Sequence, residues 1–277
     1  MEQGQIVKIL SDTHFVNWNG NLFECKCRGK FRNAKVTPLV GDYVEFDKEK
    51  QVIEKILPRR NAFDRPLVSN IDQAFLITSV KHPDFSTNLL DKLLVVMELH
   101  HVRPIICLTK LDLLTRSERK EMKKIMHYYR KLGYRVLTNR NLWQIKMLFR
   151  NKTSVFTGQT GAGKSSLLNR LNSKLQLETG EISLALGRGK HTTRHVELLE
   201  LFGGKVLDTP GFSSLEFKNY SKEQIRDAFV EFRKFPCDFK DCMHLKERHC
   251  GVKDALDSGY ILPSRYENYV KILKESR

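Results

Sequence analysis

The chain has 277 residues, of which 40% are hydrophobic, and its 48 basic and 32 acidic side chains give a formal net charge of +16. This length allows two or three domains, and the absence of an 18-residue apolar run or a basic, apolar leader argues against a membrane protein or a secreted one; we expect a cytoplasmic monomer. The positive charge favours a polyanionic partner, with nucleic acid as the leading candidate.

Residues 1–65 contain short apolar or alternating runs separated by turn residues. This pattern predicts a small β-barrel of the OB type. A cationic loop with one aromatic ring would suit RNA, although a purely structural barrel with solvated loop charges is the alternative. The loop residues in question are Arg28, Lys30, Phe31 and Arg32, and residues 61–66 are predicted to be a linker.

Residues 66–220 are predicted to form an α/β domain. Residues 74–80 and 104–109 are continuous apolar runs, which is typical of parallel strands covered on both faces. Apolar residues at helical spacing between them predict a crossover helix. A second helix, residues 117–132, carries many lysines and arginines, which we interpret as a solvated face rather than an RNA contact.

The run Thr109-Lys110-Leu111-Asp112 fits the [NT]KxD guanine motif and follows an apolar strand. The Asp112 carboxylate would accept hydrogen bonds from guanine N1–H and the exocyclic amine, whereas adenine offers no donor at those positions. An unpaired buried charge costs roughly 3 to 5 kcal/mol, which predicts a preference of about 100-fold or more for GTP. Lys110 would pack its stem along the base.

A phosphate loop of the GxxxxGK[ST] pattern follows the predicted strand 153–157 and precedes a predicted helix. Its glycines would let successive amides point at the β-phosphate, with the helix N-terminus behind them. Lys164 would bridge the β- and γ-phosphates, and the Ser165 hydroxyl would ligate Mg²⁺. The loop consists of Gly158, Gln159, Thr160, Gly161, Ala162, Gly163, Lys164 and Ser165.

The two motifs stand in reversed order, since the guanine motif precedes the phosphate loop by about fifty residues. A circularly permuted GTPase domain explains this order, because permutation alters connectivity and leaves the sheet unchanged when the original termini lie close together. In the permuted chain the C-terminal domain directly follows the segment that senses hydrolysis. We therefore expect nucleotide-coupled movement of residues after about 215.

Residues 195–201 and 204–208, joined through Gly203-Gly204, are predicted to form a hairpin that places Asp208 at a strand end. Asp208-Thr209-Pro210-Gly211 is the DxxG motif of a GTPase. Asp208 should hold Mg²⁺ through water, and the Gly211 amide should contact the γ-phosphate.

Residues 187–194 form a cationic, glycine-bearing loop where the first switch should lie. We favour Thr193 as the second Mg²⁺ ligand, with Thr192 as the alternative. Phe212 stands where many GTPases have a water-orienting Gln. His191 is the nearest candidate for that role, although it could instead order the switch or face a partner. Hydrolysis should be slow in the free protein and accelerated by a partner.

Residues 221–277 contain Cys237-x4-Cys242-x-His244-x5-Cys250, a Cys₃His set that predicts one structural Zn²⁺. Such binding is worth roughly 10 to 16 kcal/mol, so the segment should need its metal to fold. His249 is an alternative ligand, but its place next to Cys250 is awkward.

The order of the guanine motif, GQTGAGKSS, GRGKHTT, DTPGF and the cysteine cluster resembles the bacterial ribosome small-subunit-dependent GTPase A family. The resemblance implies an OB barrel, a permuted GTPase core and a mainly helical zinc domain. It also implies a role in late maturation of the small ribosomal subunit, which stimulates GTP hydrolysis and supplies the rRNA partner.

The resemblance implies that residues 158–166 bind phosphate, so that Ser166 joins the loop residues named above. It also favours His191 as the hydrolytic residue. Arg194 departs from members that continue the threonine run, which leaves Thr192 and Thr193 both open. The rival function is a GTP-regulated RNA-binding scaffold in which hydrolysis is incidental. A further rival, an RNA-dependent ATPase, predicts tighter binding of ATP than of GTP.

Overall fold

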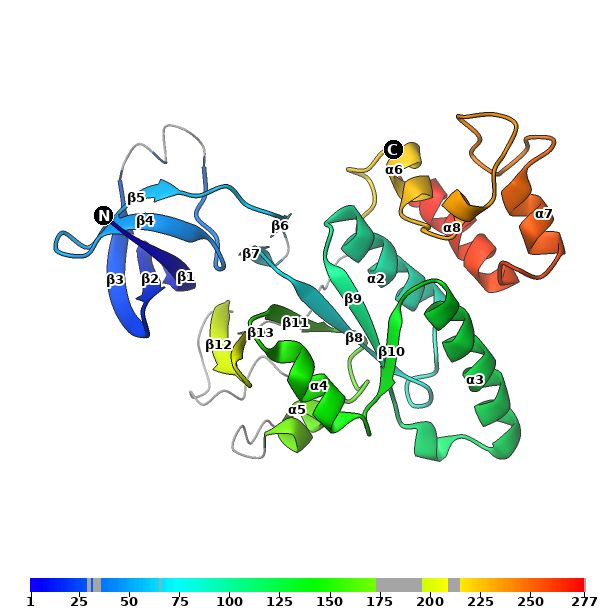
Figure 1. The fold of residues 1–277 in the computed structure, drawn as a ribbon, viewed down its shortest axis with the longest axis horizontal. Helices are drawn as coiled ribbons and strands as arrows, with labels where there is room; N and C mark the ends of the chain where they lie inside the picture. Colours follow the sequence, from blue (N-terminus) through cyan, green and yellow to red (C-terminus); the bar gives the residue numbers. More distant parts are fainter. Residues whose placement is uncertain (29–30, 32–35, 65, 173–195, 209–214, 277) are drawn as a thin grey trace.

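The computed structural model describes the whole chain except residues 29–30, 32–35, 65, 173–195, 209–214 and 277. An N-terminal barrel, a central α/β domain and a C-terminal helical region lie along the molecule (Figure 1). The three-part architecture expected from the sequence is therefore confirmed.

The barrel has five strands that close on themselves in the order β1-β2-β3-β5-β4, with β4 pairing back to β1. Strands β3 and β5 run parallel, and the other pairs are antiparallel. Alternate residues of the strands face inward and form a separate apolar core that includes Ile6, Val16 and Phe46. The strands are β1 (Glu2–Leu10), β2 (Thr13–Trp18), β3 (Asn21–Cys27), β4 (Tyr43–Asp47) and β5 (Val52–Ile56).

The segment predicted to be a plain linker forms a short hairpin instead. Strands β6 (Ala62–Asp64) and β7 (Leu67–Ser69) pair antiparallel. A buried carboxylate, Asp42, ties the hairpin to the barrel, because it accepts from Arg59 Nε at 2.7 Å and from Ser69 Oγ at 2.6 Å. The hydrogen bonds to Asp42 come from residues on either side of the predicted linker, so residues 61–66 alone do not reveal the hairpin.

The central sheet has the order β10-β9-β8-β11-β13-β12, and every neighbouring pair except β12 with β13 is parallel. β12 also meets β1 of the barrel through the pair Lys8 and Glu197. All seven residues of β8 are buried, as the continuous apolar run predicts. The strands are β8 (Gln73–Ser79), β9 (Arg103–Thr109), β10 (Arg135–Thr138), β11 (Thr153–Thr157), β12 (Glu197–Leu201) and β13 (Gly204–Asp208).

Helices cover both faces of this sheet (Figure 1). On β8, Ala74 and Leu76 belong to the apolar cluster of α2 and α3, whereas Phe75 and Ile77 belong to the cluster of α4 and α5. This alternation is why residues 74–77 of the strand are apolar without interruption. The helices are α2 (Thr87–Leu99), α3 (Arg116–Lys131), α4 (Leu142–Phe149), α5 (Lys164–Leu171) and the 3₁₀ turn η1 (Leu111–Leu113).

The C-terminal region is mainly helical and packs against α2, with residues of both parts in one continuous apolar cluster. At its centre the fully buried Arg265 donates to Asp91 of α2 and to Glu231, each at 2.7 Å. The elements are α6 (Lys222–Asp227), the 3₁₀ turn η4 (Phe232–Lys234), α7 (Gly251–Asp257) and α8 (Pro263–Glu275).

The predicted hairpin of β12 and β13 is present, but its turn residues are Phe202 and Gly203. Both have positive φ, 52° and 73°, as a tight hairpin turn requires. Gly204 instead begins β13, where an added Cβ would lie 1.9 Å from the carbonyl oxygen of Phe149. In the described part of the chain, no helix has the length and apolarity that crossing a bilayer demands.

Candidate nucleotide site and metal centre

The predicted nucleotide motifs meet at one edge of the sheet. Because β8, β9 and β11 are parallel neighbours, the loops that follow their carboxyl ends lie side by side. A direct bond joins two of these loops, since Thr109 Oγ1 donates to the carbonyl oxygen of Ala162 at 2.6 Å. The guanine motif and the phosphate loop thus form one site despite their reversed order in the chain.

The phosphate loop depends on glycine at two positions. Gly158 has φ 140°, and an added Cβ would lie 2.0 Å from the backbone oxygen of Ile77 in β8. Gly163 has φ 91° and is the residue from which α5 begins. The loop therefore bends tightly against β8 and presents the N-terminus of α5 to the space where phosphates would lie.

Lys164 lies across this loop, with Nζ donating to the carbonyl oxygens of Gly158 at 2.8 Å and Gln159 at 2.7 Å. Partial burial lowers the pKa of Lys164 from its ordinary value. Because the Lys164 ammonium already lies at the loop, a small movement would let it donate to phosphate oxygens in place of these carbonyl oxygens. Ser165 is buried in the first turn of α5, and its hydroxyl could ligate Mg²⁺.

The guanine motif turns sharply after β9. Lys110 has φ 58°, and its ammonium donates to the carbonyl oxygen of His82. Asp112 then lies in η1 with its side chain exposed, and Arg119 of α3 donates to the Asp112 carbonyl oxygen at 3.2 Å. No described residue donates to the Asp112 carboxylate, so this acceptor is available for a base.

A fourth loop at this edge was not predicted from the sequence. Residues 138–141 follow β10, which is parallel to β9. Asn139 N donates to the Leu108 carbonyl oxygen at 2.9 Å, and Arg170 of α5 donates to the Asn139 carbonyl oxygen at 3.1 Å. The loop therefore lies between the guanine motif and the phosphate-loop helix. The only sequence signal was a Thr-Asn-Arg-Asn run after a short apolar stretch.

The predicted switch residues are described only in part. Asp208 is the last residue of β13, which pairs with β11 just before the phosphate loop. The backbone of Asp208 therefore ends at the same edge as the other loops. His191, Thr192, Thr193 and Gly211 lie outside the described residues.

The predicted metal ligands come together in the C-terminal region. The ligand atoms of Cys237, Cys242, His244 and Cys250 all lie within 4.8 Å of one another. Tetrahedral zinc bonds of about 2.3 Å to sulfur and 2.0 to 2.1 Å to nitrogen imply S···S edges of about 3.8 Å and S···N edges of about 3.5 Å. The Sγ atoms of Cys237 and Cys250 are 3.8 Å apart, and His244 Nδ1 is 3.5 Å and 3.3 Å from them.

The surroundings of this cluster also favour a cation. Burial raises the pKa of the Cys242 thiol to about 12, so a thiolate there needs a positive charge beside it. Tyr269 donates to the Met243 carbonyl oxygen at 2.6 Å, and Tyr266 donates to that of His244, which fixes the backbone of the ligand loop. His249 is exposed and lies outside the cluster, so the structure selects His244 from the two histidines.

Comparison with known proteins agrees with this geometry. The family model described as RsgA GTPase matches residues 56–218, and that of the RsgA N-terminal domain matches residues 3–53. The Small ribosomal subunit biogenesis GTPase RsgA 2 of Oceanobacillus iheyensis is 48% identical, with 99% of this chain and 97% of that protein covered. The RsgA of Geobacillus kaustophilus is 45% identical, with 100% and 98% covered.

Two solved structures share the whole fold. YjeQ from Thermotoga maritima has a TM-score of 0.86 at 36% identity and covers 99% of this chain and 98% of its own. YloQ, described as a circularly permuted GTPase, has a TM-score of 0.84 at 38% identity, with 99% and 94% covered. Sequence, fold and the loops at the sheet edge agree, and this chain belongs to the RsgA family of GTPases.

Proposed function

We propose that this protein hydrolyses GTP to assist maturation of the small ribosomal subunit in the cytoplasm, and that the subunit stimulates hydrolysis. The names of its relatives support this role, since they are small ribosomal subunit biogenesis GTPases that match along the full chain. The net charge of +16 suits a partner made largely of RNA. The single observation that carries the GTPase half is the contact of Thr109 with Ala162, which unites the base loop and the phosphate loop.

In this proposal the phosphate loop, residues 158–166, surrounds the β-phosphate with amides, and Lys164 moves from the loop carbonyls onto the β- and γ-phosphates. Asp112 accepts from guanine N1–H and the exocyclic amine. Mg²⁺ supplies charge neutralisation at the phosphates, with Ser165, Thr193 and a water held by Asp208 as the coordinating groups. Gly211 contacts the γ-phosphate, and His191 orients the attacking water.

We assign the Cys₃His cluster to one structural Zn²⁺. Three thiolates and an imidazole prefer this ion, and all four positions belong to the protein, which leaves no open position for catalysis. We keep the monomeric state and the domain boundaries 1–65, 66–220 and 221–277 as predictions; sedimentation analysis and limited proteolysis would test them.

The deciding experiment measures GTP turnover of the purified chain alone, with small subunits and with large subunits. We expect small subunits to accelerate turnover by several orders of magnitude, because Phe212 stands where many GTPases have a water-orienting Gln and a partner can complete the positioning of the attacking water. Large subunits should have no such effect. Equal turnover in all three samples would favour the scaffold in which hydrolysis is incidental. His191→Ala should abolish the stimulated rate and leave GTP affinity nearly unchanged.

Base recognition has its own test. Asp112→Asn should lose guanine preference by about 100-fold, because an amide cannot accept from both guanine donors. The same variant should gain affinity for xanthosine triphosphate, since the amide N–H can donate to the xanthine oxygen that replaces the guanine amine. Binding titrations with GTP, ATP and xanthosine triphosphate measure both changes. An unchanged preference in Asp112→Asn would remove this residue from base recognition.

A further inference from the structure

Helix α3 carries a row of cations along one face. The cations Arg116, Lys120, Lys123 and Arg130, together with the imidazole of His127, follow one another at steps of three or four residues, and all are exposed. Such spacing places side chains on one side of a helix. At 1.5 Å per residue the row spans about 21 Å, which is long enough for an extended ligand rather than a single ion.

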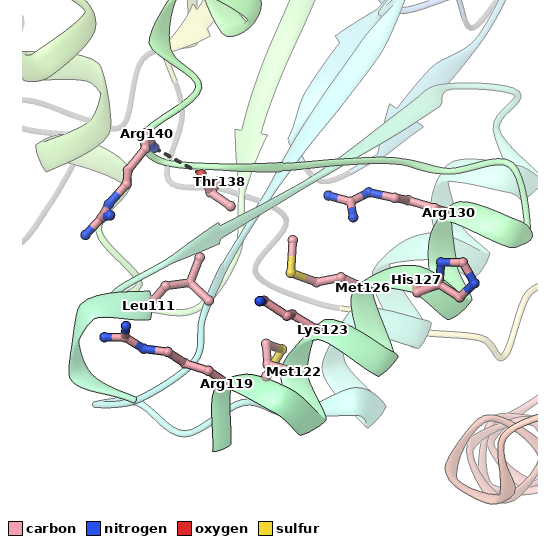
Figure 2. Close-up of a pocket in the computed structure, with 9 residues that line it drawn as sticks. All are labelled: Leu111, Arg119, Met122, Lys123, Met126, His127, Arg130, Thr138 and Arg140. Carbon is pink, nitrogen blue, oxygen red and sulfur yellow. Dashed lines mark hydrogen bonds between the residues drawn. The ribbon is translucent and has the colours of Figure 1, made fainter. Parts of the chain in front are cut away.

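The row borders a pocket with an apolar floor, called here the α3 groove (Figure 2). The pocket has a volume of about 520 Å³. Lys123 reaches over the floor, and Arg140 approaches from the loop after β10 (Figure 2). The floor consists of Leu111, Met122 and Met126, and the rim consists of the cations Arg119, Lys123, Arg130 and Arg140 with the imidazole of His127.

The acidic residues of α3 do not neutralise this rim. Glu118 accepts from Lys81 Nζ at 2.9 Å, and Glu121 accepts from Lys124 at 2.8 Å. Both carboxylates are therefore already paired with other lysines. The rim therefore remains positively charged. The expectation from the sequence, that the charged face of α3 is only solvated, does not explain the apolar floor beside it.

We propose that the α3 groove binds single-stranded RNA, with phosphates on the exposed cations of the α3 row and the rim and one unpaired base in the pocket. Guanidinium planes stack on bases, and methionine sulfur contacts aromatic rings favourably, so Arg119, Met122 and Met126 suit a flat heterocycle. A pocket of about 520 Å³ falls in the size range of sites for small organic groups. An acidic protein segment would use the charges, but it has less need of guanidinium planes around an apolar floor.

The groove adjoins the guanine loop. Leu111 belongs to both, and Arg119 donates to the carbonyl oxygens of Leu114 at 3.1 Å and of Asp112 at 3.2 Å. A strand in the groove would therefore contact the residue that braces the base-recognition turn. The inference rests on the proposed function only for the source of the RNA, which would be the small subunit.

The test uses the full-length protein and a fluorescent oligouridylate of about ten nucleotides, with binding followed by anisotropy. The variant is Lys120→Glu/Lys123→Glu. Its control is Lys271→Glu/Lys274→Glu, which makes the same charge change at the same spacing on exposed positions of α8. Neither pair belongs to the nucleotide site, so unchanged GTP affinity verifies that both variants fold.

We expect the α3 variant to bind the RNA at least about 10-fold more weakly at low salt, and the control to remain within about 2-fold. Loss of two phosphate contacts should also reduce the slope of log affinity against log salt by about 1.4. An equal-length RNA duplex and the same strand with abasic sugars should bind more weakly than the intact strand.

Equal weakening by the two variants would overturn the proposal, because it would reflect net charge alone. Equal binding of the abasic strand would overturn the base pocket, and competition by polyglutamate as effective as that by RNA would overturn the assignment to RNA. The assay contains neither ribosomal subunits nor GTP hydrolysis, so its failure is distinguishable from failure of the proposed function.

Discussion

The two ends of the GTPase domain are joined to their neighbours in different ways. The C-terminal region shares one apolar cluster with α2 and inserts the fully buried Arg265 between Asp91 and Glu231. The barrel also has a core of its own, and its β1 contributes Val7 to the large cluster. The same junction includes the pair Lys8 with Glu197 and the hydrogen bond from Lys205 to Gln5. The first junction therefore continues the core around a fully buried ion network, whereas the second combines a smaller apolar contact with polar contacts.

This difference indicates which parts move together. Helix α2 runs into β9, and β9 ends in the guanine motif, so the C-terminal region is anchored to an element that positions the base. We expected residues after about 215 to move with the nucleotide. The shared core implies that any such movement carries α2 with it, whereas movement of the barrel would disturb fewer buried apolar residues, such as Val7, together with polar contacts.

The largest effect should follow loss of the metal. Cys242→Ser removes a buried ligand, and we expect the protein to lose binding worth about 10 kcal/mol or more and to unfold around residues 237–250. Zinc stoichiometry and limited proteolysis would show a metal-free, cleaved C-terminal region and a surviving barrel. Cys27→Ser, which lies outside the cluster, is the matched control. Proteolytic resistance of the metal-free C-terminal region would contradict the prediction.

The next effect tests the shared core. Arg265→Ala leaves two buried carboxylates without their cation and should lower the free energy of unfolding by about 3 to 5 kcal/mol. Urea denaturation measures the change. Lys92→Ala is the control, because its bond to Glu275 at 2.7 Å is a surface contact worth at most about 1 kcal/mol. A loss below about 1 kcal/mol for Arg265→Ala would mean that the two parts are not held by this network.

A smaller effect is expected at the barrel. Arg59→Ala removes one partner of Asp42, but Asp42 still accepts from Ser69 Oγ at 2.6 Å and from Leu39 N at 2.8 Å. We expect a loss of about 1 to 3 kcal/mol. Hydrogen exchange should place this loss in the barrel strands and the β6–β7 hairpin, and exchange that rises equally in α2 and α8 would show that the barrel is not independent.

The smallest effect concerns the pair between β1 and β12. The Lys8 and Glu197 side chains are 3.0 Å apart and 21% and 37% exposed. Lys8→Ala should therefore change the free energy of unfolding by less than about 1 kcal/mol, and less still in high salt. A change comparable to that of Arg265→Ala, measured by the same urea denaturation, would remove the contrast between the two junctions.

Much of this architecture follows from local sequence. Continuous apolar runs predict β8 and β9, and glycines at fixed spacing predict the phosphate loop with β11 before it, because these patterns reflect burial and backbone conformation of nearby residues. The Cys₃His spacing predicts the metal cluster for the same reason, since all four ligands lie within fourteen residues.

The features that could not be predicted depend on distant partners. Arg265 looks like any arginine of an amphipathic helix until α8 packs on α2 and buries it beside Asp91. The segment at residues 61–66 looks like a linker because the buried Asp42, which accepts from Ser69 of the hairpin, lies 27 residues before its partner in the chain. The base-side loop at residues 138–141 carries no motif, and only the sheet order places it at the site.

The order of strands in the sheet has a consequence for folding during translation. β8 lies between β9 and β11, but β11 follows it in the chain by about seventy residues. At about 5 to 20 residues per second, a ribosome making this chain leaves one edge of an apolar strand without its neighbour for several seconds. Until β11 has been synthesised, that edge of β8 keeps unpaired backbone groups that could pair with another chain.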